Sequence, residues 1–199
     1  MTRKVRADAV GNREHLVATA RAAFAAEGVD LSMREVAQRA GLGVATLYRH
    51  FPTRTDLISE ALAEHVAACR AGMRIAESEP DAWLALSGAI RWFAEHQIRA
   101  PGLNEALSGP HATVFRADRQ AQAAALERLV ARAQRQSVLR PGVSVADVRV
   151  ALMAISSLRP TRAHPRPAAI RTVLGLLLEG LRSPGVGGMP RTPGPARYN

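Results

Sequence analysis

Cysteine, lysine, aromatic residues and long apolar runs are all scarce in this chain of 199 residues. Its one cysteine, Cys69, excludes an intrachain disulfide and favours a reducing compartment such as the cytoplasm. No stretch of about 18 uncharged apolar residues occurs, which argues against a membrane-spanning helix. The basic N-terminus has no apolar segment behind it of the kind that a signal peptide needs. We therefore expect a cytoplasmic protein with no membrane partner.

The chain is basic, with a formal net charge of +10, which favours a polyanionic partner. Residues 1–56 hold nine Lys and Arg against six Asp and Glu, whereas the remainder holds 18 against 11, so the charge is spread along the chain. Nearly all of it is arginine, since Lys4 is the only lysine. Solvated helix faces explain such a distribution more simply than a designed patch does. Charge alone therefore does not identify a nucleic-acid surface.

Apolar residues recur at helical spacing from residue 11 to residue 182, and Gly and Pro residues separate the segments. Later segments include a short one at 103–107 and a long one at 112–136. We find no internal repeat and no convincing strand. The sequence therefore predicts an all-α fold, with a unit of three helices at the N-terminus and a bundle of about six helices after it.

The segment 32–56 (SMREVAQRAGLGVATLYRHFPTRTD) is the most informative part of the chain. A capping box, Ser followed three residues later by Glu, begins a helix that ends at Gly41. A helix of about two turns follows at 43–50, and Pro52 stops it before a second capping pattern begins the next helix. Two short helices joined by a glycine turn are the layout of a helix-turn-helix, in which the second helix enters the DNA major groove.

The second of these helices carries a polar face that burial does not explain. Leu47 and Phe51, four residues apart, are expected to face the first helix, which leaves Ala45, Thr46 and the Tyr48-Arg49-His50 cluster pointing outward. Tyrosine and histidine offer donors to phosphates, and an arginine can read a base. The alternative is a surface turn with incidental polar residues, but the caps, the glycine and the proline together favour DNA binding.

Residues 12–62 resemble the N-terminal DNA-binding domain of the TetR family of transcriptional regulators. The motif that carries the resemblance consists of Ala37, Ala40-Gly41, Thr46-Leu47-Tyr48, His50-Phe51 and Leu57. The resemblance implies that Tyr48, His50 and Arg54 bind phosphates. It further implies that Val44, Ala45, Thr46 and Arg49 face the groove and that Arg34 of the preceding helix can reach a base. Gly43 replaces the usual serine cap and Arg54 the usual lysine, which removes one hydroxyl contact but preserves the charge.

These patterns divide the chain into four parts. Residues 1–11 are expected to form a flexible basic arm, in which Arg3, Lys4 and Arg6 either enter a minor groove or remain a solvated tail. Residues 12–56 are expected to form the helix-turn-helix domain. Residues 57–182 are expected to form a helical domain, for which the resemblance implies ligand sensing and dimerisation. Residues 183–199 are rich in Pro and Gly and are expected to be disordered.

The resemblance implies that the last two helices build a homodimer interface, and two wide apolar stripes at 145–155 and 170–181 support it. The alternative is that both stripes belong to the protomer's own core. The residues predicted for the interface are Val148, Leu152, Ile155, Ile170, Val173, Leu174, Leu177, Leu178 and Leu181. The segment 138–155 (VLRPGVSVADVRVALMAI) also resembles the C-terminal region of the SbtR-like subgroup.

An effector pocket in the helical domain is predicted with less support, because core packing accounts for most of the same side chains. The candidates are the bulky and polar aromatic residues of its middle, together with one methionine: Trp83, Trp92, Phe93, His96, His111, Phe115 and Met153. Their mixture of apolar walls with a few polar groups is typical of small-molecule sites.

Two other classes of protein remain as alternatives, a helical enzyme and an interaction module without DNA binding. The chain has no phosphate-binding glycine loop, nucleophile elbow or His-Glu-x-x-His motif, so no catalytic residue is predicted. His65 and Cys69 are four residues apart, but no third ligand accompanies them, so neither a metal nor another cofactor is expected. Retention of Tyr48, His50 and Arg54 argues against the interaction module. The sequence predicts a homodimeric repressor that binds a pseudo-palindromic operator and is released by a small-molecule effector.

Overall fold

The computed structural model describes residues 2–100, 115–159 and 165–184, and this part of the chain is helical, as predicted. Outside the helices its β-type pairing is a single antiparallel bridge between Leu139 and Arg182. The helices are α1 (Thr2–Glu27), α2 (Met33–Arg39), α3 (Val44–His50), α4 (Arg54–Ser78), α5 (Ala82–Arg99), α7 (Arg116–Arg135), α8 (Val145–Ser157) and α9 (Arg166–Leu181).

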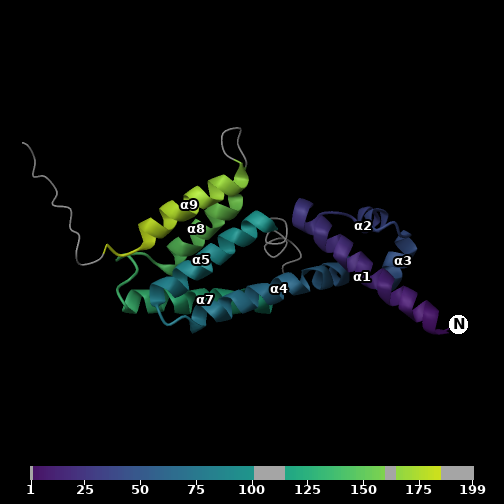
Figure 1. Cartoon of the computed structure of the whole chain (residues 1–199), viewed down its shortest axis with the longest axis horizontal. Helices are drawn as coiled ribbons and strands as arrows, with labels where there is room; N and C mark the ends of the chain where they lie inside the picture. The colour runs from purple at the N-terminus through teal and green to yellow at the C-terminus, as the bar shows by residue number, and fades with distance from the viewer. Residues whose placement is uncertain (1, 101–114, 160–164, 185–199) are drawn as a thin grey trace, which may run out of the picture.

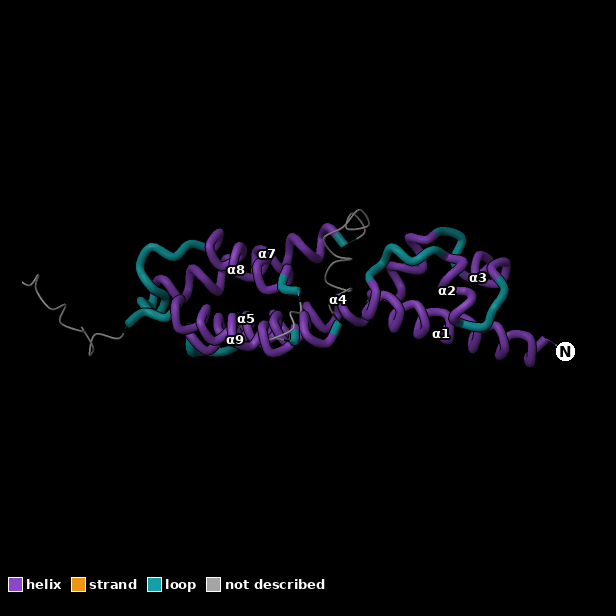
Figure 2. Tube along the Cα trace, turned by 90° about the horizontal axis from the view of Figure 1, so that it is seen from above, coloured by secondary structure: helices purple, strands orange, loops and turns teal. Residues whose placement is uncertain are grey.

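The molecule is elongated, with two groups of helices joined by α4 (Figures 1 and 2). Helices α1, α2 and α3 gather around the first half of α4, and we call this unit the head. Helices α5, α7, α8 and α9 pack with one another and with the second half of α4, and we call this unit the bundle. Each unit has its own hydrophobic core, and α4 contributes Leu57, Ile58 and Leu62 to the first and Ala76 to the second.

The capping boxes predicted at the starts of three helices, α2, α4 and α8, are confirmed. Ser32, Thr53 and Ser144 each accept a hydrogen bond from the backbone N–H three residues later, and a carboxylate at that position accepts from the cap's own N–H. Reciprocal pairs of this kind satisfy two of the donors that a helix start leaves open. Gly28 and Gly41 have φ values of 87° and 65°, which lie in the left-handed region that favours glycine after a helix.

The N-terminal residues differ from the prediction of a flexible arm, because α1 begins at Thr2 and runs without a break to Glu27. Residues 2–10 contain no proline or glycine and are rich in Ala and Arg, which are strong helix formers, so continuation of the helix is the local preference. The predicted helix at 103–107, His111 and most of the tail at 183–199 lie outside the described residues.

The two C-terminal stripes lie mainly inside the bundle. Six of the nine residues predicted for the dimer interface are buried in the second core, and the other three, Leu152, Val173 and Leu177, are half-buried against it. The buried six are Val148, Ile155, Ile170, Leu174, Leu178 and Leu181. Helix α5 contacts both α8 and α9 and covers these faces. The two stripes therefore fit the alternative that they belong to the protomer's own core better than they fit an interface with a second protomer.

Candidate nucleic-acid interface and ligand cavity

The turn between α2 and α3 is held by backbone hydrogen bonds and by α1. The N–H of Leu42 donates to the Ala37 carbonyl at 3.0 Å, while the N–H of Thr46 donates to that of Gly43 at 2.9 Å. The His15 ring nitrogen Nε2 lies 3.0 Å from the Ala40 carbonyl, which ties α1 to the end of α2. Gly43 caps α3 in an extended conformation without a side-chain hydrogen bond, as expected for glycine. Helix α3 is therefore positioned by its backbone and its buried residues.

Two inward side chains orient α3 against the head. Leu47 and Phe51 are completely or almost completely buried, with exposed fractions of 0% and 1%. The face opposite them is open: Ala45, Tyr48 and Arg49 are exposed, while Val44, Thr46 and His50 are half-buried. Tyr48 is among the exposed large hydrophobic side chains of the described residues, at 48%. The predicted division of α3 into an inner and an outer face is present.

The arginines of the head separate into paired and unpaired groups. Arg13 pairs with Glu60, Arg21 with Glu64, and Arg39 makes a two-pronged ion pair with Glu27 at 2.6 and 2.8 Å. Arg34 and Arg49 are exposed, and neither has an ion-pair partner within the described part of the chain. Among the head arginines whose side chains the structure describes, those without an ion pair or a hydrogen bond are thus the two that were predicted to reach bases.

Carboxylates near the turn are already engaged. The Arg39 guanidinium holds the pKa of Glu27 below its usual range, and the Ser32 hydroxyl and N–H lower the pKa of Glu35 in the same way. Both carboxylates are therefore ionised at neutral pH and bound to local partners. Glu35 and Glu27 act in capping and pairing, which limits the repulsion that free acidic groups would exert on a phosphate backbone.

Arg54 and His50 are less exposed than the phosphate-binding role implied by the resemblance would suggest. Arg54 is half-buried and donates through Nη2 to the Val29 carbonyl, and its Nε is buried without a partner in the part of the chain that the structure describes. The side chain therefore ties the start of α4 to the loop after α1. His50 is half-buried as well, and its Nε2 has no hydrogen-bond partner in the described residues. The structural role of Arg54 was not visible in the sequence, since its partner is a backbone carbonyl 25 residues away.

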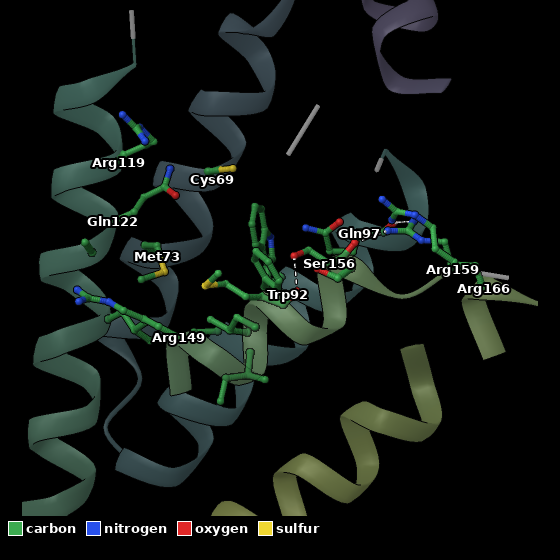
Figure 3. A pocket seen from close by; sticks show the side chains of 18 residues that line it. Cys69, Met73, Trp92, Gln97, Arg119, Gln122, Arg149, Ser156, Arg159 and Arg166 are labelled. Atoms are coloured by element: carbon green, nitrogen blue, oxygen red, sulfur yellow. Dashed lines mark hydrogen bonds between the residues drawn. The ribbon is translucent and has the colours of Figure 1, made fainter. Parts of the chain in front are cut away.

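A cavity of about 770 Å³ lies in the bundle, between α4, α5, α7 and α8 (Figure 3). Its volume is within the range of about 300–1,000 Å³ that small-molecule sites occupy. Of the seven predicted pocket residues, Trp92, Phe93 and Met153 line it. His96 lies behind the wall, stacked on the Trp92 ring at a centroid distance of 3.5 Å, and burial lowers the pKa of His96.

Two predicted pocket residues lie away from the cavity, and a third falls outside the described residues. Trp83 lies under the Arg182 guanidinium, 5.7 Å from the ring centroid, and does not line the cavity. Phe115 is buried in the core of the head, and His111 is outside the described residues. The sequence interpretation missed the polar lining, which comprises Gln97, Arg119, Gln122, Arg149, Ser156, Ser157, Arg159 and Arg166. Gln97 and Gln122 carried a signal, because each is four residues from an apolar residue of the inner helix face.

The His65 and Cys69 pair fits core packing rather than a metal site. Both side chains are buried, and burial raises the pKa of the Cys69 thiol to about 11, so the thiol is neutral at physiological pH. Within the described ranges no three His, Cys, Asp or Glu residues come together as metal ligands.

Comparison with known proteins adds evidence that geometry cannot supply. Residues 16–61 match the family of bacterial regulatory proteins of the tetR type, and residues 81–183 match the C-terminal domain of SbtR-like transcriptional regulators. The second match alone spans more than half of the chain. The chain belongs to the TetR family. Members of this family are transcriptional regulators rather than enzymes, and the head is a helix-turn-helix DNA-binding domain.

Solved structures support the same assignment over most of the chain. A TetR regulator from Mycobacterium vanbaalenii is 30% identical, with 89% of this chain and 99% of that one covered and a TM-score of 0.56. The TetR regulator SCO0520 from Streptomyces coelicolor is also 30% identical, with coverages of 86% and 99% and a TM-score of 0.57. The ketosteroid regulator KstR2 of Mycobacterium tuberculosis, at 19% identity and a TM-score of 0.65, is similar in fold alone.

Curated relatives match over a short stretch of the chain. An HTH-type transcriptional regulator of Staphylococcus aureus is 43% identical over 54 residues, which are 27% of this chain and 29% of that protein. The match thus spans less than a third of the length of either protein. Within the described residues, no helix has the length and apolar character needed to cross a membrane.

Proposed function

We propose that this TetR-family protein is a cytoplasmic homodimeric repressor that binds a pseudo-palindromic operator and leaves it when a small molecule enters the bundle. The observation that supports the DNA contact best is the pair of exposed, unpaired guanidinium groups on α2 and α3, Arg34 and Arg49. Arg49 faces the groove beside Ala45 and Thr46, while Tyr48 and His50 donate to phosphates. Footprinting on the DNA upstream of the protein's own gene tests this proposal, since such a repressor protects a symmetric site there.

Replacing Arg49 with alanine is expected to weaken operator binding by about 1–3 kcal/mol, or roughly 5- to 150-fold, because one base-reading contact is lost. Fluorescence anisotropy with the footprinted fragment measures the change. Arg39→Ala is the matched control: it removes another exposed arginine nearby, but one that Glu27 already binds, so affinity should stay near wild type. Equal affinity of Arg49→Ala and wild type for the operator would contradict the assignment.

The dimer contact that we propose lies on the outer faces of α8 and α9. Val150 and Leu176 are each 66% exposed, and Gly175 and Gly180 on the exposed side of α9 allow a second helix to approach closely. Large apolar side chains left on the surface of adjoining helices favour a partner. A two-fold contact here places two heads on one operator, as two half-sites require.

Leu176→Glu is expected to raise the dimer dissociation constant by about tenfold or more, because the carboxylate would have to lose its water at the interface. Sedimentation velocity at micromolar concentration measures the monomer fraction. Ile75→Glu is the control, since Ile75 is similarly exposed at 71% but lies on α4. A Leu176→Glu protein that remains as dimeric as the control would rule out this face.

Contact between the cavity and α4 supports release by a ligand. A Cβ atom at Gly72 of α4 would lie only 2.8 Å from Cε2 of Trp92, so the indole that lines the cavity rests directly on that helix. Helix α4 also carries Leu57 and Ile58 of the head's core. A ligand that favours a different placement of Trp92 therefore favours a different placement of the head, and this difference in affinity lowers operator binding.

A further inference from the structure

We propose that the cavity binds an amphipathic anion, with its charged group between Arg119 and Gln122 of α7 and its apolar body along Trp92. This inference rests on the proposed ligand-sensing function and names the class of ligand. Trp92, Phe93 and Leu126 form part of the apolar wall, and the volume of about 770 Å³ leaves room for an extended hydrophobic group.

The charges around the cavity are of one sign. Four arginines line it, and no Asp or Glu does so among the described residues. Two of the four already have partners: Arg149 pairs with Glu127 at 2.7 Å, and Arg166 donates to the backbone carbonyls of Gln97 and Leu158. Arg119 and Arg159 are exposed and have no ion-pair partner in the described ranges. A cationic ligand would meet only like charge here.

Arg119 is favoured over Arg159 because a second donor accompanies it. Gln122 lies three residues later on the same face of α7, and its Nε2 is buried with no hydrogen-bond partner among the described residues. A buried donor without an acceptor raises the free energy of the empty site, so a ligand oxygen that accepts from it gains affinity. Figure 3 shows Arg119 and Gln122 together on α7, with Arg159 and Arg166 at the opposite side of the view.

The neighbours of this pair do not supply a competing negative charge. The Cys69 thiol, which also lines the cavity, is neutral at physiological pH because burial raises its pKa to about 11. Asp118 precedes Arg119, but Arg70 of α4 binds its carboxylate, and Asp118 does not line the cavity. An arginine has only donors, so the group that satisfies Arg119 and Gln122 together is an oxygen-bearing anion, either a carboxylate or a phosphate.

The test uses Trp92 as a reporter in the full-length protein. The chain has two tryptophans, and Trp83 does not line the cavity, so a Trp83→Phe variant reports on the cavity alone. Four probes with the same chain are titrated below their micelle concentrations: dodecanoate, dodecyl phosphate, dodecanol and dodecyltrimethylammonium. We expect one or both anions to bind about tenfold or more tightly than dodecanol, and the ammonium to bind most weakly. The two anions distinguish a carboxylate from a phosphate headgroup.

Variants locate the headgroup. Arg119→Gln and Gln122→Leu should each reduce the preference for the anion over dodecanol to about threefold or less. Arg116→Gln is the matched control, since it removes an exposed positive charge from the same helix at a position that does not line the cavity, and it should keep the preference. Measuring a ratio of two affinities removes effects of a variant on folding or on the apolar wall.

Either of two results overturns this inference: dodecanol binding as tightly as both anions, or neither anion binding. Both measurements are made without DNA, so neither result says whether the protein binds an operator. Failure of the proposed regulator would instead be the absence of a protected operator in footprinting, whatever binds in the cavity.

Discussion

Replacing Phe51 with alanine is expected to lower the free energy of unfolding of the head by about 3–5 kcal/mol. The side chain is 1% exposed in the core that joins α1, α2, α3 and α4, and the Arg13 guanidinium lies over its ring, 5.1 Å from the centroid. Removal leaves a cavity that the surrounding helices fill only in part. Since Phe51 and Leu47 orient α3, DNA binding should be lost together with stability. Urea unfolding followed by circular dichroism measures the loss.

Tyr48→Ala is the matched control for this result. Tyr48 is an aromatic residue of the same short helix, but it is 48% exposed, so its removal should change stability by no more than about 0.5 kcal/mol. The variant should still lose affinity for DNA, because a phosphate donor has gone. Unfolding of Phe51→Ala at the same urea concentration as Tyr48→Ala would show that the inner and outer faces of α3 are assigned wrongly.

Replacing Ile155 with alanine is expected to lower the free energy of unfolding by about 2–5 kcal/mol. Ile155 is completely buried in the core of the bundle, where α5, α8 and α9 meet. Thermal or urea unfolding of the full-length protein measures the change. Val150→Ala on the same helix is the control, because Val150 is 66% exposed and its truncation removes little buried contact within the protomer.

The two variants also separate a core from an interface. We expect Ile155→Ala to lower the unfolding midpoint at every protein concentration while the protein remains dimeric in sedimentation. A weakened dimer with an unchanged midpoint would instead support the sequence-based assignment of Ile155 to the interface.

The local structure of the head was largely predictable from its sequence. The capping boxes at Ser32 and Thr53, the glycine turn at Gly41 and the stop at Pro52 depend on residues at most a few positions apart. Interactions of such short range leave a pattern that can be read without the fold. The same reason explains why Leu47 and Phe51 could be assigned inward and Arg49 outward.

The C-terminal apolar stripes show a feature that a sequence pattern cannot predict, namely which partner covers an apolar helix face. An apolar stripe states that a helix face is covered, but not whether another helix of the same chain or a second protomer covers it. Helix α5 decides the question for Ile155 and Ile170, and its contacts with α8 and α9 join residues far apart in the sequence. The exposed Val150 and Leu176 belong to faces that the interpretation did not select.

By itself the sequence determined the helical class, the three capping boxes at Ser32, Thr53 and Ser144 and the family resemblance of the Tyr48-containing motif, and it predicted which residues face DNA. Only the tertiary structure decided that Arg39 is bound by Glu27 whereas Arg34 and Arg49 are available, and that Arg54 is tied to the Val29 carbonyl. It also decided that arginine and glutamine are among the polar groups of the cavity's described lining, while His96 stacks on Trp92 without lining the cavity. Periodicity records which side chains avoid water, whereas the partner of a charged or polar group depends on which helix lies opposite it.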